Sequence, residues 1–174
     1  MGPIIKNIKE KKMNNNLDTN FLVKSALVAA LYAVLTLLLP MASYGPIQLR
    51  FSEIMVLLVF YNKRFIPGLV LGCAIANMFS PMLAFDVIFG TLSSLIAFEL
   101  IKRTKSLFIA SLWPVLMVIV PALGTYFILA NDAVLIIMIL EFMASEFIMV
   151  SIIGVVIFKI LEKNNGFMKY IKEF

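Results

Sequence analysis

The placement of the basic residues constrains this chain more than any other feature. Fourteen of its fifteen Lys and Arg residues fall in four clusters that lie between long apolar runs. The clusters are Lys6, Lys9, Lys11, Lys12 and Lys24; Lys63 and Arg64; Lys102, Arg103 and Lys105; and Lys159, Lys163, Lys169 and Lys172. Cytoplasmic loops of multi-pass membrane proteins carry such an excess of positive charge. The pattern predicts six spans with both termini in the cytoplasm, and it leaves Arg50 alone on the outer side.

Composition supports an integral membrane protein. Of the 174 residues, 62% are hydrophobic, and the mean hydropathy is +1.01. A soluble domain could not bury that much apolar surface, so we expect lipid to cover it in a multi-pass protein of the cell membrane. The juxtamembrane placement of the positive charge favours lipid headgroups over nucleic acid. The chain has one cysteine and no histidine, so no disulfide, metal site or cofactor is expected.

The apolar runs predict an all-α bundle of six transmembrane helices. We expect residues 1–20 to form a cytoplasmic tail, 21–162 the membrane domain and 163–174 a second cytoplasmic tail. No cleavable signal sequence is expected in the polar N-terminal stretch. The expected spans are 21–39, 48–62, 65–79, 82–101, 107–129 and 133–160.

The second and third spans are short for a hydrocarbon core of about 30 Å. A tilted spanning pair and a re-entrant hairpin are both open. The hairpin would place Lys63 and Arg64 at membrane depth, which is costly, so spanning helices are favoured.

Charged side chains within the spans are the candidate functional groups, because charges in a bilayer usually face a cavity or a partner. Arg50 and Glu53 are three residues apart and share a helix face. They form either a simple ion pair or part of a ligand cavity that also includes Gln48. Asp86 and Asn77 flank the turn after the third span and are expected to lie close together.

The remaining glutamates differ in their expected roles. Glu99 lies one turn from Lys102 and Arg103 at the cytoplasmic end, where a salt bridge is expected. Glu141 and Glu146 are five residues apart and lie on different helix faces, so one of them is expected to reach the cavity. Such a cavity holds more acids than bases and suits a ligand with cationic or multiply donating nitrogen groups.

Small residues form a stripe along the first span, which allows another helix to approach closely. The pattern alone does not decide between packing inside the bundle and contact with a partner protein. The stripe consists of Ala26, Ala29, Ala30 and Ala33.

An ordered series of motifs resembles the QueT family of membrane proteins, which are assigned to import of queuosine precursors. The motifs are GPIQLRFSEIMVLL (45–58), PGLVLGCAIANMFSP (67–81) and DVIFGTL (86–92), with ALVAALYAVLT (26–36) and SEFIMVSIIG (145–154) in the first and last spans. The resemblance covers roughly residues 24–160. It departs from the family at Ser145, where a glycine is usual.

The resemblance implies the substrate-binding S component of an energy-coupling factor (ECF) transporter, which works with a transmembrane coupling subunit and two ATPase subunits. It implies that the alanine stripe contacts the coupling subunit. The expected ligand is a 7-deazaguanine such as preQ1 or queuine, with Tyr44 or a phenylalanine stacked on its ring. The expected substrate-binding residues are Tyr44, Gln48, Arg50, Glu53, Asn77, Asp86 and Glu146.

Three other functions compete with this interpretation. The chain could be an S component for another small vitamin, which a binding screen would distinguish. It could be a membrane-embedded enzyme with Glu53 and Asp86 as acid and base, although the lack of histidine argues against this. It could be a stand-alone channel or exporter. The sequence contains no Walker A pattern, so energy from ATP would have to come from partner subunits.

Overall fold

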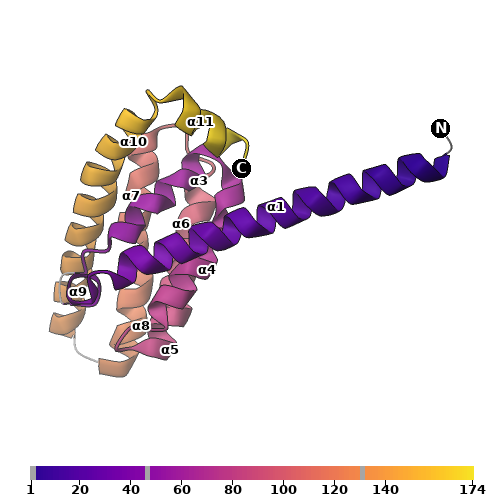
Figure 1. Ribbon diagram of the computed structural model, residues 1–174. Coiled ribbons are helices and arrows are strands. Elements are labelled where there is room, and N and C mark those ends of the chain that lie inside the picture. Colours follow the sequence, from indigo (N-terminus) through magenta and orange to yellow (C-terminus); the bar gives the residue numbers. More distant parts are fainter. Residues whose placement is uncertain (1–2, 46–47, 130–131) are drawn as a thin grey trace.

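Every element of the described chain is helical (Figure 1). The computed structural model describes the backbone of residues 3–45, 48–129 and 132–174. Its elements are α1 (Pro3–Leu37), α2 (Pro40–Ser43), η1 (Phe51–Leu57), α3 (Leu58–Tyr61), η2 (Lys63–Phe65), α4 (Ile66–Asn77), α5 (Leu83–Phe85), η3 (Asp86–Gly90), α6 (Thr91–Ile101), α7 (Leu107–Met117), α8 (Ile119–Leu129), α9 (Asp132–Glu146), η4 (Phe147–Gly154), α10 (Val155–Leu161) and α11 (Asn165–Lys172). Segments η1 and η2 are 3₁₀ helices, whereas η3 and η4 are π-helical.

Four helical stretches in the described residues are long and apolar enough to cross a bilayer. They are Thr19–Leu37, Leu83–Ile101, Leu107–Gly124 and Leu135–Leu161, at the positions of four predicted spans. The second and third predicted spans correspond to the shorter helical stretches Phe51–Tyr61 and Ile66–Asn77. The all-helical membrane fold is therefore confirmed, while the six-span count and the cytoplasmic termini stay predictions.

The bundle has apolar side chains both inside and outside. Tyr32, Leu69 and Phe98 are at most 1% exposed, whereas Leu31 and Ile137 are half exposed or more. Exposure of such an outer surface to water would cost a free energy of about 25 cal/mol per Å² of apolar area. A lipid environment accounts for it.

The most extensive helix contact among the described residues lies between α1 and α4, and glycines allow the close approach. A Cβ atom at Gly68 would lie 2.7 Å from the backbone oxygen of Ser25. One at Gly72 would lie 2.8 Å from the backbone oxygen of Ala29 and 2.7 Å from Cβ of Tyr32. The two glycines are four residues apart and therefore form the small-residue face on which α1 rests.

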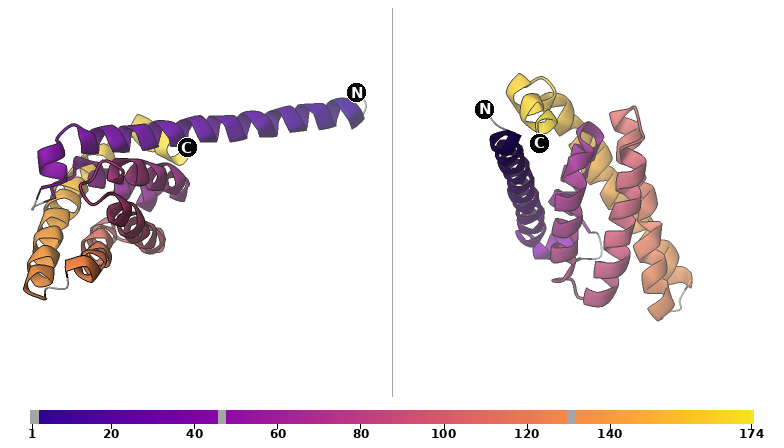
Figure 2. Two further views of the ribbon diagram at one scale, coloured as in Figure 1. Left: turned by 90° about the horizontal axis from the view of Figure 1, so that it is seen from below. Right: turned by 90° about the vertical axis from the view of Figure 1, so that its right-hand side faces the viewer.

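Both predicted tails are helical in the described residues. The N-terminal part of α1 continues beyond the bundle, as Figure 1 and the left view of Figure 2 show. The C-terminal helix α11 packs across the end of the bundle. There Asn62 Nδ2 donates to the Ile171 carbonyl (2.9 Å), and Lys24 Nζ donates to the Glu173 carbonyl (3.2 Å). Because α11 has one apolar and one polar face, it can pack on the bundle with its lysines outward.

Candidate functional site

A pocket with several polar side chains in its lining lies inside the bundle, between η1, α4, η3, α6, α7 and α8 and the end of α9. It encloses about 680 Å³ of empty space, part of it open to solvent. Six of the seven predicted substrate-binding residues line it: Gln48, Arg50, Glu53, Asn77, Asp86 and Glu146. The other lining residues are Val56, Cys73, Gly90, Ser93, Ser94, Ala97, Phe98, Pro114, Val118, Pro121, Phe142 and Ser145. The structure thus brings together residues that are up to 98 positions apart, from Gln48 to Glu146.

The three acids of the pocket share one local feature of the backbone. Glu53 lies in the 3₁₀ segment η1, Asp86 begins the π-helical segment η3, and Glu146 directly precedes the π-helical segment η4. Such departures from α-helical geometry re-aim side chains and recur at functional sites.

Arg50 is held by neutral oxygen atoms. Its Nη1 donates to Oδ1 of Asn77 (3.0 Å), and its Nε donates to the backbone oxygen of Ser43 (3.1 Å). Within the described part of the chain it makes no ion pair with Glu53 or Asp86. The simple Arg50–Glu53 ion pair is therefore not formed, and both side chains line the cavity instead.

Tyr44 supports Arg50 from outside the pocket lining. The Arg50 guanidinium lies 5.4 Å from the centre of the Tyr44 ring. The Tyr44 hydroxyl donates to the Ala76 carbonyl at 2.5 Å. Burial raises the pKa of this hydroxyl, so the hydroxyl remains a donor at neutral pH. The structure therefore places Tyr44 beside the site, and its stacking on a ligand stays a proposal.

Asn77 is fully buried at the end of α4, where it contacts Arg50 and faces Gly90 of η3. Its Nδ2 lies 3.4 Å from the Cys73 sulfur, and its Oδ1 accepts from Arg50. A Cβ atom at Gly90 would lie 2.7 Å from Nδ2 of Asn77. The glycine therefore leaves the space that the amide occupies at the pocket wall.

The carboxyl groups of Asp86 and Glu146 differ in their hydrogen bonding. Ser80 Oγ donates to Oδ2 of Asp86. Ser80 belongs to the turn that the sequence predicted between Asn77 and Asp86. In contrast, Oε2 of Glu146 is buried and has no hydrogen-bond partner in the described residues. Glu141 does not line the pocket, so Glu146 is the glutamate of α9 that faces it. An unpaired buried carboxyl oxygen is costly, so it needs a proton or a donor from water or a ligand.

The wall formed by α6, α7 and α8 contains groups that the sequence did not identify. Pro121 has no N–H, so the Met117 carbonyl four residues earlier lacks its usual donor. Ser93 Oγ donates to that carbonyl at 2.7 Å. Ser94 lies beside Ser93 on the pocket lining and donates to the Gly90 carbonyl (3.1 Å). The adjacent Ser93 and Ser94 in an apolar span could have indicated that this side of the helix lines a pocket.

Tyr32 was also missed, although it controls one of the acids. Its hydroxyl donates to Oε1 of Glu53 at 2.5 Å, and both side chains are buried. Tyr32 lies on the same face of α1 as Ala29 and Thr36. A phenol on the inward face of a span needs an acceptor, and this rule could have identified the contact.

The alanine stripe of α1 is divided between two faces. Ala29 and Ala33 are buried, at 2% and 7% exposure, and Ala29 packs against α4. Ala26 and Ala30 are exposed on the outside of the bundle. Half of the stripe therefore serves internal packing, and the other half is open to a partner.

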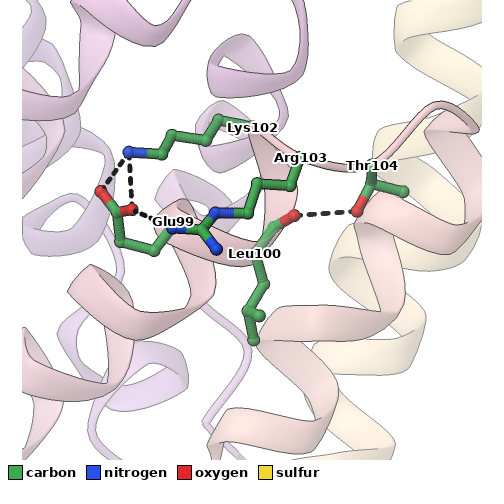
Figure 3. A network of polar contacts seen from close by, with 5 residues as sticks. All are labelled: Glu99, Leu100, Lys102, Arg103 and Thr104. Atoms are coloured by element: carbon green, nitrogen blue, oxygen red, sulfur yellow. Dashed lines mark hydrogen bonds and ion pairs between the residues drawn. The ribbon is translucent and has the colours of Figure 1, made fainter.

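Glu99 lies outside the pocket, as predicted. Lys102 Nζ is 2.6 Å from Oε2 of Glu99, and Arg103 Nη2 is 3.7 Å from the same atom (Figure 3). Thr104 Oγ1 donates to the Leu100 carbonyl at 2.8 Å beside this network. The predicted salt bridge at the end of the fourth predicted span is confirmed, and Glu99 is excluded from the site.

Comparison with known proteins identifies the family. A family model described as QueT transporter matches residues 22–163. The chain belongs to the QueT transporter family. The queuosine precursor transporter QueT of Lactococcus lactis subsp. cremoris (strain MG1363) is 44% identical to it over 81 residues. This match covers 45% of the chain and about half, 47%, of that protein. No solved structure matches the chain.

Membership in the QueT transporter family decides one of the predicted alternatives. The family consists of transporters, so the interpretation as an enzyme is excluded. With four apolar helices long enough to span a bilayer, this QueT family member is a multi-pass protein of the cell membrane.

Proposed function

We propose that this protein is the substrate-binding membrane subunit for uptake of a queuosine precursor, a 7-deazaguanine such as preQ1 or queuine. The observation that carries the proposal is the charge balance of the pocket. Three carboxylates, those of Glu53, Asp86 and Glu146, face one guanidinium, which already donates to neutral oxygens. Carboxylates in a low-dielectric site are costly without donors or a positive charge.

A 7-deazaguanine supplies both kinds of group. Its guanine-like edge presents N–H donors, which a carboxylate can accept in pairs. The aminomethyl group of preQ1 is cationic near neutral pH and suits a second carboxylate. We assign these contacts to Glu53 and Glu146, and we assign a free N–H of Arg50 to the ring carbonyl. Gln48 and Asn77 complete the polar lining, with Asp86 near the turn.

We further propose that the pocket opens to the outside of the cell. The positive-inside pattern supports cytoplasmic termini and, with them, an outer position for the loop before Arg50. Arg50 and Tyr44 lie at that end of the bundle. A ligand from outside would therefore reach the pocket beside them.

Binding calorimetry with preQ1, queuine, guanine and thiamine tests the proposal. We expect preQ1 to bind at least about tenfold more tightly than guanine, because guanine lacks the ammonium that a buried carboxylate would accept. Thiamine serves as the control for a different vitamin class. Tighter binding of thiamine than of preQ1, or no binding of any deazaguanine, would contradict the proposed substrate.

The energy for uptake is proposed to come from an ECF coupling subunit and two ATPase subunits. On this proposal the coupling subunit contacts the exposed half of the alanine stripe, Ala26 and Ala30. Small side chains on an exposed helix face allow close approach of a partner helix. The neighbouring exposed residues Leu27 and Val34 extend the same apolar surface.

Replacement of Ala30 by leucine is expected to reduce ATP-dependent uptake by about tenfold or more while preQ1 affinity stays within about twofold, because the larger side chain separates the two helices. Uptake is measured in liposomes that contain the protein and its native partners. Ala144→Leu, at another exposed alanine, is the matched control. Equal uptake by the two variants would contradict the interface. Uptake by the isolated protein would instead support a stand-alone channel or exporter.

A further inference from the structure

Tyr32 is buried, and its hydroxyl contacts a residue of the pocket although Tyr32 itself does not line the pocket. The residue is 1% exposed, and its hydroxyl donates to Oε1 of Glu53 at 2.5 Å. Glu53 lines the pocket and Tyr32 does not. A ligand would therefore meet the carboxylate, while the phenol stays behind it.

The two oxygens of Glu53 are in different situations. Oε1 accepts from Tyr32, and Oε2 takes no part in that contact. A carboxylate that is anchored through one oxygen loses its freedom to rotate, so its other oxygen keeps one direction. Anchoring before the ligand arrives lowers the entropy lost on binding. Glu146 has no comparable donor on its buried Oε2.

The position of Tyr32 is itself fixed by close packing. A Cβ atom added at Gly72 would lie only 2.7 Å from Cβ of Tyr32, so α1 packs directly on α4 at this residue. One turn further along α1, Thr36 Oγ1 lies 2.7 Å from Ser52 Oγ. That second polar contact also joins α1 to η1, but neither Thr36 nor Ser52 lines the pocket. It provides a control for effects of general packing.

We propose that Tyr32 is a positioning residue for ligand binding, which holds Oε1 of Glu53 so that Oε2 is presented to a donor of the ligand. The inference rests on the proposed function, since it assigns the 7-deazaguanine donor to Glu53. It adds a residue of α1 to a site whose lining comes from the rest of the chain. Tyr32 acts through Glu53 and makes no contact with the ligand.

The Tyr32→Phe variant removes the hydroxyl and keeps the ring. Its preQ1 affinity, measured by calorimetry, is expected to fall by about tenfold, because Glu53 loses its anchor and keeps a buried unpaired oxygen. Thr36→Val, which removes the neighbouring polar contact, is expected to change affinity by less than about twofold. Glu53→Asp keeps the charge but withdraws the carboxylate from the hydroxyl, and it provides a second variant with the same expected loss.

A double-mutant comparison separates positioning from packing. In a Glu53→Gln background, Tyr32→Phe is expected to cost less than about threefold, whereas in a Glu146→Gln background it keeps its tenfold effect. The infrared carboxyl band assigned to Glu53 is expected to shift in ligand-free Tyr32→Phe. Equal losses in both backgrounds, an unshifted band, or unchanged affinity would overturn the role of Tyr32. If the wild-type protein binds no deazaguanine, the proposed function fails, and the inference fails with it; if only Tyr32→Phe is without effect, the proposed function stands.

Discussion

Replacement of Glu146 by glutamine is expected to weaken preQ1 binding by about tenfold to a hundredfold, because a charge-assisted hydrogen bond contributes about 1.5–3 kcal/mol. The expectation follows from Oε2 of Glu146, which is buried and unpartnered in the described residues. The same loss is expected for Glu53→Gln. Asp86→Asn is expected to lose less, since Ser80 already donates to that carboxylate.

Glu141→Gln is the matched control, because it makes the same change on the same helix outside the pocket. Its preQ1 affinity should stay within about twofold of the wild-type value. Calorimetry on the purified variants, together with thermal unfolding to verify the fold, makes the comparison. Wild-type affinity in both Glu53→Gln and Glu146→Gln would exclude a site centred on these carboxylates.

Much of the fold could be predicted because a bilayer imposes simple requirements on sequence. Apolar runs separated by basic clusters located the four long helices, and the charges within those runs identified the charged residues of the pocket. The type of helix around the three acids of the pocket could not be predicted. Glu53 and Asp86 lie within 3₁₀ and π-helical segments, and Glu146 directly precedes one. Such segments leave no periodic signal in an apolar run.

The sequence also left contacts unresolved where one residue type has two uses. Alanines spaced four residues apart can face the interior of the bundle or a partner protein. Helix α1 has alanines on both faces, with Ala29 buried and Ala30 exposed. Arg50 could have paired with Glu53, but Asn77 and the Ser43 backbone supply its acceptors instead. The direction of each side chain depends on the neighbouring helix, and spacing alone does not contain that information.

Gly72 is a position where a single methyl group is expected to have a large structural effect. A Cβ atom there would lie 2.8 Å from the Ala29 carbonyl oxygen and 3.0 Å from its Cα, both of which are backbone atoms. Backbone cannot move aside as the end of a side chain can, so α1 must shift as a whole. Gly72→Ala is therefore expected to lower the free energy of unfolding by about 1–3 kcal/mol, with a larger loss for leucine.

The shift should reach the pocket, because the same face of α1 carries Tyr32. Gly72→Ala is therefore expected to weaken preQ1 binding as well as to lower the thermal midpoint, although residue 72 does not line the pocket. Gly166→Ala is the control: it adds the same methyl group in the first turn of α11, at an exposed position. If Gly72→Ala matched that control in both thermal midpoint and affinity, α1 would not be held against α4 by this contact, and the orientation of Tyr32 toward Glu53 would require another cause.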